Sequence, residues 1–129
     1  MTARPTEPLP VIEAFLSAMG RKDYDEGLKY LAPDCQYRNI PLPGVLIGPA
    51  GARAMLEPFF APTIENDLRI IHAVIDGAHV FTERLDRHLL DSGWVELPVA
   101  GVWEVQGGLI TAWRDYFDAA TILDKWPTG

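Results

Sequence analysis

Two aspartates and one arginine have the types and spacing that acid–base chemistry requires. Arg84 and Asp86 stand two positions apart in a segment of alternating polarity, and Asp115 lies in a second such segment. Residues i and i+2 of a strand point to one face, so Arg84 and Asp86 share a face. Two carboxylates held by a guanidinium that keeps its proton titrate as a coupled pair. One can carry a proton at neutral pH while the other stays ionised, as paired general acid–base catalysis requires.

A largely apolar segment lies between the segment of Arg84 and Asp86 and the segment of Asp115, and it could form the wall of a pocket. Its alternate residues form one apolar face: Val95, Leu97, Val99, Gly101 and Trp103. We predict that this face lines a pocket and that the neighbouring strands place both aspartates and Arg84 on the same side. Gly101, in mid-strand, predicts a bend or a bulge.

Strand parity assigns further residues to these faces. The face of Asp115 is expected to carry Leu109, Thr111, Trp113 and Phe117, and that of Asp86 to carry Thr82 and His88. Tyr37 and Asn39 share a face of an earlier strand. An aspartate–arginine pair on a strand is also often a surface ion pair of little energetic consequence, and spacing alone leaves both interpretations open.

Helices are expected mainly in the first half of the chain. Apolar residues at helical spacing predict a helix over 8–19, ended by Gly20. Asp23 is a candidate N-cap for a short helix to about residue 31. A third helix is expected at 50–60, with Pro58 bending it or ending it early. We expect Asp118 to cap a short helix that runs through Lys125.

The second half of the chain predicts a meander of long strands. These are expected at 64–75, 79–90, 94–105 and 109–117, joined by turns at 76–77, 91–93 and 107–108. An earlier strand is expected at 35–40, after a turn at 33–34 and before a loop at 41–51. This order predicts an α+β fold: a strongly curved, mixed but mostly antiparallel sheet with three to four helices, forming a cone around a deep pocket.

Composition sets the limits of function. With 129 residues, 48% hydrophobic, the chain is expected to form one domain over residues 1–129, with 1–7 as a loose N-terminal arm. The net charge of −7 disfavours nucleic acid and anionic substrates and leaves a neutral, apolar small molecule as partner. We find no segment that could span a membrane and no secretory signal, and one cysteine, Cys35, which fits the cytoplasm.

No sequence motif for a metal or a nucleotide is present. The three histidines lack ligand spacing, and His72 and His79 are interpreted as structural. There is no GxSxG, P-loop or GxGxxG pattern. We therefore expect no metal and no cofactor.

Three short motifs together closely resemble the limonene-1,2-epoxide hydrolase family. They are TERLD at 82–86, WRDYFD at 113–118 and YRNIPLP at 37–43, and the resemblance extends from the first helix to Asp118. It implies a nuclear-transport-factor-2-like fold, a homodimer without metal or cofactor, and one-step hydrolysis of an epoxide to a vicinal diol by water, without a covalent intermediate.

The resemblance also implies a role for each site residue. Asp115 would be the general base on the water, which Tyr37 and Asn39 help to hold, and Asp86 would be the general acid. Arg84 would bridge the two acids. The substrate pocket would include Leu97, Val99 and Phe117. His88 is a departure, since it stands where the family has an apolar pocket residue.

Two other functions remain open at this point. One is an isomerase or cyclase of the ketosteroid-isomerase-like type, with one aspartate as base and neutral oxyanion donors. The cationic Arg84 argues against it. The other is a non-catalytic small-molecule binding module, which would not need two acids around an arginine.

Overall fold

The computed structural model describes residues 4–127, and its sheet has six strands in the order β2-β1-β6-β5-β4-β3. The strands are β1 (Leu31–Ile40), β2 (Leu46–Ile47), β3 (Glu65–Asp76), β4 (His79–Leu90), β5 (Gly93–Gln106) and β6 (Leu109–Phe117). Only β1 and β6 pair in parallel, and the other pairs are antiparallel. The predicted α+β class with a mixed, mostly antiparallel sheet is confirmed.

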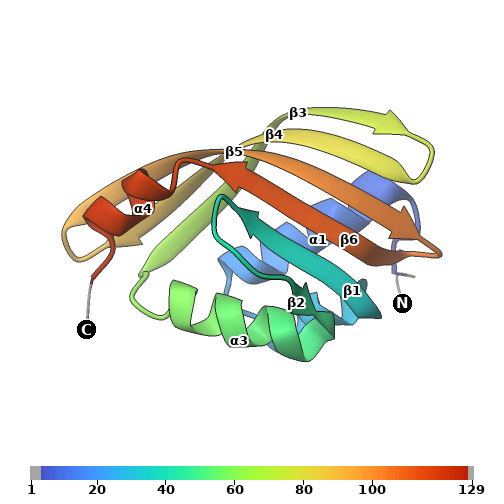
Figure 1. The fold of residues 1–129 in the computed structure, drawn as a ribbon, viewed down its shortest axis with the longest axis horizontal. Helices are drawn as coiled ribbons and strands as arrows, with labels where there is room; N and C mark the ends of the chain where they lie inside the picture. Colours follow the sequence, from blue (N-terminus) through green and yellow to red (C-terminus); the bar gives the residue numbers. More distant parts are fainter. Residues whose placement is uncertain (1–3, 128–129) are drawn as a thin grey trace.

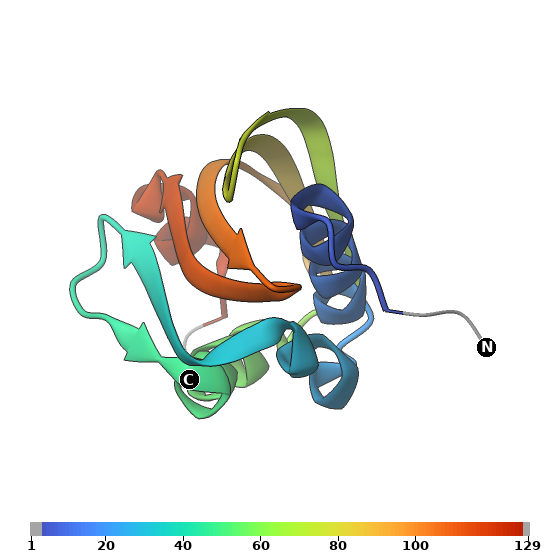
Figure 2. The ribbon, with the colours of Figure 1, turned by 90° about the vertical axis from the view of Figure 1, so that its right-hand side faces the viewer.

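Four α-helices accompany the sheet within the described residues. They are α1 (Pro8–Gly20), α2 (Tyr24–Gly27), α3 (Gly48–Phe60) and α4 (Ala119–Lys125), and a 3₁₀ turn at Leu28–Tyr30 follows α2. Figures 1 and 2 show α3 beside β1 and β2, and α1 beneath the curved strands β3, β4 and β5. None of the helices in residues 4–127 has the length and apolar run that a bilayer crossing demands.

The core lies between α1 and the sheet. The buried side of α1 includes Ile12, Phe15 and Met19. The Phe15 ring packs edge-on against Trp103 of β5 and Trp113 of β6, at centroid distances of 6.1 and 5.1 Å. Such aromatic contacts contribute beyond their buried area, so they fix α1 over the centre of the sheet.

The cross-strand register predicted for the site is confirmed. Arg84 lies opposite Val99 and Asp86 lies opposite Leu97 in the β4–β5 pair. On the other side of β5, Gly101 lies opposite Asp115 of β6. The alternation along β4, β5 and β6 therefore brings both aspartates and Arg84 to the inner face of the sheet.

Both predictions of helix N-caps are confirmed. The Asp23 side chain accepts a hydrogen bond from the Glu26 backbone N–H at 3.3 Å, and the Asp118 side chain accepts one from that of Ala120 at 3.0 Å. These carboxylates bond N–H groups that have no partner within the helix.

The predicted turn at 33–34 and the predicted loop at 41–51 are wrong in part. Strand β1 begins at Leu31 and absorbs Pro33 in a register shift between Leu31 and Gln36, because proline has no N–H for the ladder. Within the expected loop, β2 pairs with β1 and α3 begins at Gly48. Gly48 has φ +69°, and a Cβ there would collide with the carbonyl oxygen of Pro33.

Pro58 does not end α3 early. The helix continues to Phe60 with Pro58 inside it. The proline removes one backbone hydrogen bond within the last turn, where helices are already loosely bonded.

Of the bend or bulge predicted at Gly101, the bulge is wrong, because pairing is continuous across that residue on both sides. The register shift lies instead at Thr111, since Glu104 pairs with Ala112 and Val105 pairs with Ile110. This extra residue reverses the alternation, so Leu109 and Thr111 do not share the face of Asp115, and Ile110 is buried in their place.

The described part of the predicted N-terminal arm touches the rest of the chain. Arg4 donates a hydrogen bond to the Lys29 carbonyl at 2.9 Å and lies 4.6 Å above the centroid of the Tyr30 ring. Residues 1–3 lie outside the described residues.

Candidate active site

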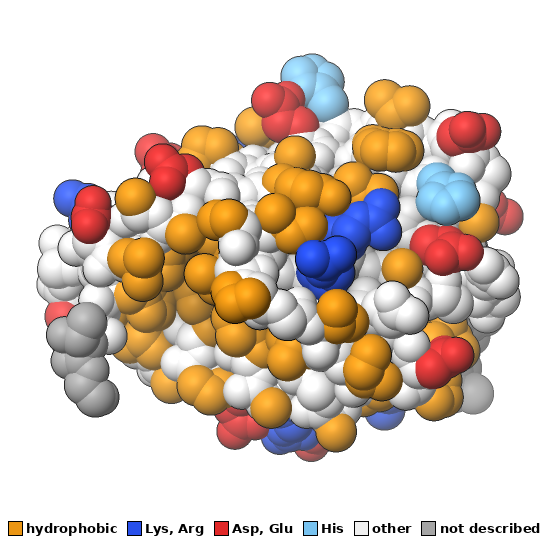
Figure 3. All heavy atoms as spheres, in the orientation of Figure 1, with side chains coloured by type: hydrophobic (Ala, Val, Ile, Leu, Met, Phe, Trp, Pro, Cys, Tyr) orange, Lys and Arg blue, Asp and Glu red, His pale blue; other side chains and the backbone are white. Residues whose placement is uncertain are grey.

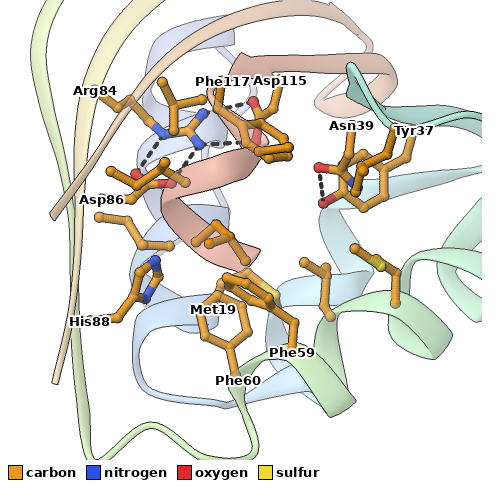
Figure 4. A pocket seen from close by; sticks show the side chains of 18 of the residues that line it. Met19, Tyr37, Asn39, Phe59, Phe60, Arg84, Asp86, His88, Asp115 and Phe117 are labelled. Atoms are coloured by element: carbon orange, nitrogen blue, oxygen red, sulfur yellow. Dashed lines mark hydrogen bonds and ion pairs between the residues drawn. The ribbon is translucent and has the colours of Figure 1, made fainter. Parts of the chain in front are cut away.

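A cavity of about 110 Å³ lies between the inner face of the sheet and the helices. Every site residue predicted from the sequence lines it: Tyr37, Asn39, Arg84, Asp86, His88, Leu97, Val99, Asp115 and Phe117. Most of the remaining wall is apolar and comes from α1, α3 and α4, including Met19, Phe59, Phe60 and Ile122. Figure 4 shows the polar residues around this space, with the two aspartates on either side of Arg84.

The Arg84 guanidinium bonds both carboxylates through two hydrogen bonds each. Its Nε and Nη2 donate to the two oxygens of Asp86 at 3.0 and 2.9 Å. Its Nη1 and Nη2 donate to the two oxygens of Asp115 at 3.0 Å each. Arg84 is 2% exposed, and both aspartates are buried. The surface ion pair that the sequence left open is therefore excluded for this triad.

Asp115 has one more donor than Asp86 among the described residues. The Trp113 indole N–H donates to Asp115 Oδ1 at 2.7 Å. Trp113 is held in a stack, with Tyr37 at 3.9 Å on one side and Trp103 at 4.8 Å on the other, both nearly parallel to it. The sequence placed Trp113 on this face by parity but not its bond to Asp115, which depends on the ring orientation that the stack sets.

The site has two potential negative charges and one positive charge in a buried space. Burial raises the pKa of Asp115, and Asp86 raises it further, while Arg84 and the Trp113 donor oppose the shift. Burial disfavours the charged form of Arg84, but the two carboxylates raise its pKa well above the ordinary value. Arg84 is thus a permanent cation, and one added proton would make the triad neutral.

Tyr37 and Asn39 lie beside Asp115 through the parallel β1–β6 pair. Asn39 is in register with Asp115, and Tyr37 with Trp113. The Tyr37 hydroxyl donates to Asn39 Oδ1 at 3.0 Å. Burial raises the pKa of Tyr37, so its hydroxyl keeps its proton. The predicted pair is therefore assembled, and its hydrogen bond joins its two members to each other.

Sequence reasoning missed Asn66. It lies opposite His88 in the β3–β4 register, and its Oδ1 is 2.7 Å from His88 Nδ1. Burial lowers the pKa of His88 to about 4, which leaves the imidazole neutral at pH 7. The contact between Asn66 and His88 could have been predicted only from the pairing of β3 with β4, and a single sequence specifies such pairing poorly.

Gly101 provides the space that the guanidinium occupies. A Cβ at this position would lie 2.8 Å from Thr82 Oγ1, 2.8 Å from Trp103 Nε1 and 2.9 Å from Arg84 Nη1. Glycine in mid-strand thus marks a close approach by side chains.

Within residues 4–127, no three His, Cys, Asp or Glu side chains gather in a way that could hold a metal ion. The carboxylates that line the cavity, those of Asp86 and Asp115, are already hydrogen-bonded to the Arg84 guanidinium.

The family comparison agrees with this geometry. Residues 6–128 match the model of the limonene-1,2-epoxide hydrolase catalytic domain. The chain belongs to the limonene-1,2-epoxide hydrolase family. The resemblance predicted from the three motifs, and with it the enzyme class, an epoxide hydrolase of the limonene-epoxide type, is confirmed.

A curated protein and a solved structure, both from Mycobacterium tuberculosis, extend the comparison. Epoxide hydrolase EphG is 35% identical over 107 residues, which are 83% of this chain and 70% of that protein. A solved structure described as an LEH-like epoxide hydrolase is 32% identical, with a TM-score of 0.78 over 95% of this chain and 90% of that one.

More distant structures show the fold alone. A protein with a ketosteroid isomerase-like fold from Catenulispora acidiphila has a TM-score of 0.80 at 17% identity, covering 92% of this chain and 93% of that one. A protein described as SnoaL-like, from Shewanella denitrificans, has a TM-score of 0.79, also at 17% identity, covering 89% of this chain and 93% of that one. This limonene-1,2-epoxide hydrolase family member therefore has a nuclear-transport-factor-2-like α+β fold.

Gly101→Ala is expected to damage this family member through Arg84. The added methyl group must displace Thr82, Trp103 or Arg84, and overpacking of this kind costs about 1–3 kcal/mol. We expect a lower melting temperature and a loss of epoxide hydrolysis of about tenfold or more, because a displaced Arg84 would no longer hold both carboxylates in fixed orientation. Ala100→Ser, on the neighbouring exposed position, is the control. Wild-type stability and activity in Gly101→Ala would contradict the close packing.

Proposed function

We propose that this enzyme hydrolyses an apolar, cyclic epoxide to a vicinal diol in one step, with water as nucleophile and no covalent intermediate. The observation that carries the proposal is the buried Arg84 bridge between Asp86 and Asp115 at the wall of an apolar cavity. This arrangement supports one carboxyl as acid and the other as base, held in fixed relation.

Asp115 is the general base in this proposal. Three donor groups, counting both arms of Arg84 and the Trp113 indole, favour its ionised form. Its raised pKa increases its affinity for the proton of a water. Asn39 lies in register beside it, so Asn39 and Tyr37 can orient that water toward the substrate.

Asp86 is the general acid and donates to the epoxide oxygen. Only Arg84 donates to Asp86 among the described side chains, so Asp86 has one donor group fewer than Asp115 to stabilise a negative charge. An epoxide is strained, but its oxygen leaves poorly as an alkoxide. Protonation by a carboxylic acid in a dry site removes that obstacle.

The step balances in atoms and charge. The water oxygen forms a bond to one epoxide carbon while the bond from that carbon to the epoxide oxygen breaks. Asp115 takes a proton from the water, and Asp86 gives one to the epoxide oxygen. The product is a diol, and a net transfer of one proton from Asp115 to Asp86 restores the starting state.

The substrate lies, in this proposal, in a cone-shaped pocket of a single domain. Leu97, Val99 and Phe117 would contact its hydrocarbon part, as they line the cavity next to the triad. Their apolar surfaces favour a neutral hydrocarbon ring and exclude bulk water. The cationic Arg84 disfavours an isomerase, whose oxyanion would need neutral donors.

Asp86→Asn and Asp115→Asn are each expected to lower diol formation by about 10²-fold or more, since each removes one proton transfer. The assay uses limonene oxide, cyclohexene oxide and styrene oxide with product analysis. Glu83→Gln is the matched control, because Glu83 lies on the same strand and is exposed. Diol formation at the wild-type rate in either aspartate variant would reject that residue's role.

Labelled water tests whether the reaction passes through a covalent intermediate. A single turnover in ¹⁸O-water is expected to place the label in the diol, and an unlabelled first diol would indicate an enzyme ester.

The rate of hydrolysis is expected to depend on pH with a bell shape. Asp115 must be ionised to act as base, so the rate falls as pH falls through its pKa. Because burial raises that pKa, this limb lies above the usual aspartate value of about 3.9. The second limb reports loss of the proton that the carboxyl pair shares. A flat profile down to pH 4 would contradict an Asp115 of raised pKa as the base.

We also propose that two copies of the chain pair through the outer face of the sheet. Val74 lies opposite Phe81 in the β3–β4 pair, and Phe81 lies opposite Val102 of β5. Val74, Phe81 and Tyr116 are exposed. Figure 3 shows hydrophobic side chains on either side of a group of Lys or Arg side chains near the middle of one face. Exposed apolar surface next to charged side chains is typical of protein interfaces.

Sedimentation is expected to show a dimer that Phe81→Lys converts to a monomer, because the ammonium group would be desolvated in the interface. Glu13→Lys, an exposed position on α1, is the control. A monomeric wild-type protein, or a Phe81→Lys variant that remains dimeric, would reject this interface.

A further inference from the structure

One polar atom in the cavity wall has no partner. His88 is 1% exposed and lines the same cavity as the acid–arginine triad. Its Nε2 is buried without a hydrogen-bond partner among the described residues. Buried polar atoms nearly always have a partner, so one left open in a ligand cavity indicates a partner from the ligand. Figure 4 shows the ring below Asp86, on the same strand and toward Phe60.

The hydrogen bonds behind His88 determine its tautomer. The Thr63 hydroxyl donates to the Phe60 carbonyl at 2.7 Å, so its oxygen is left to accept from Asn66 Nδ2 at 2.8 Å. The amide nitrogen of Asn66 therefore faces Thr63, and its Oδ1 faces His88 Nδ1 at 2.7 Å. An amide oxygen only accepts, so Nδ1 carries the hydrogen and Nε2 presents a lone pair.

The imidazole stays neutral because burial lowers its pKa to about 4. Of the two charged groups that act on it, Arg84 lowers that pKa further and Asp86 opposes the shift. At neutral pH, Nε2 is thus an acceptor only.

Aromatic rings hold the imidazole in place without offering it a donor. Phe59 and Trp126 stack on each other at 4.5 Å, and each is nearly perpendicular to the His88 ring, at 5.4 and 5.1 Å. The Trp126 indole N–H is already used, since it donates to the Phe59 carbonyl at 3.0 Å. The protein thus fixes the direction of the Nε2 lone pair and leaves it open.

We propose that His88 Nε2 accepts a hydrogen bond from a hydroxyl group of the substrate, so that the substrate class is a hydroxylated cyclic epoxide. The inference rests on the proposed hydrolysis and names the substrate of that same site. His88 and Asp86 are two residues apart on β4, which separates them by roughly 6.6 Å along the strand. The substrate hydroxyl group then lies on the opposite side of the substrate's carbon ring from the epoxide oxygen, either on the ring itself or on a substituent of it.

Specificity follows from the unpaired acceptor. A substrate with a methyl group in place of the hydroxyl would leave Nε2 buried and unsatisfied, and sites that hydrogen-bond a substrate hydroxyl reject such analogues. His88 is in this sense a specificity-determining residue and not a member of the acid–base pair.

The test compares 4-(hydroxymethyl)cyclohexene oxide with 4-ethylcyclohexene oxide, which have nearly the same shape. We expect the wild-type enzyme to favour the alcohol in kcat/KM by about 10- to 100-fold. His88→Leu is expected to remove this preference, and His88→Gln, which keeps an acceptor, to retain part of it. Equal kcat/KM values for the two epoxides in the wild type, or a preference unchanged in His88→Leu, would overturn the proposal.

Two further measurements keep the test decisive if His88→Leu does not fold or if no epoxide is turned over. In the wild type, 4-(methoxymethyl)cyclohexene oxide, which has no O–H, is expected to lose the advantage of the alcohol. Independently of turnover, the unreactive cyclohexylmethanol is expected to shift the ¹⁵N resonance of His88 Nε2, and ethylcyclohexane is not. A shift without turnover would reject the hydrolase proposal alone, and an unchanged resonance would reject the role of His88.

Discussion

The structure depends on one buried cation. Arg84 has no charged partners other than Asp86 and Asp115 in the described residues, and it bonds all four of their carboxylate oxygens. Removing either carboxylate from an ion network in a dry interior changes the charge balance of the whole group. The register of β4, β5 and β6, the missing side chain at Gly101 and the stack behind Trp113 all serve to hold this group in one geometry.

Strand parity was enough to predict most of the site. The alternation in β4 placed Arg84 and Asp86 together, and the apolar face of β5 supplied the register that joined them to Asp115. Parity failed at Thr111, where an extra residue reverses the faces of β6. Such a bulge depends on backbone pairing with a neighbouring strand, which the local pattern of side chains does not encode. The prediction also made β1 too short, starting it at residue 35 and not at Leu31. Pro33 is typical of a turn, and the local sequence does not show the register shift that lets a strand contain it.

The contacts that prediction missed are those that join distant segments. Asn66 orients His88 across 22 positions of the chain, and Trp126 packs on Phe59 across 67. Their residue types carry no motif, and only the folded arrangement shows that they surround one imidazole. The family motifs contain the groups that we propose to react, whereas we propose that the wall around His88, which lies outside those motifs, distinguishes the substrate of this enzyme. The fold, shared with proteins at 17% identity, does not make that distinction.

The indole of Trp113 has a consequence beyond holding a carboxylate. It lies between two aromatic rings and donates its N–H to Asp115 at 2.7 Å. A tryptophan whose N–H faces a carboxylate emits light from an environment that changes when that carboxylate gains a proton. The emission of this side chain is therefore expected to change with the charge state of the site, alongside the emission of Trp94, Trp103 and Trp126. Protonation can be followed optically in the resting protein, separately from catalysis.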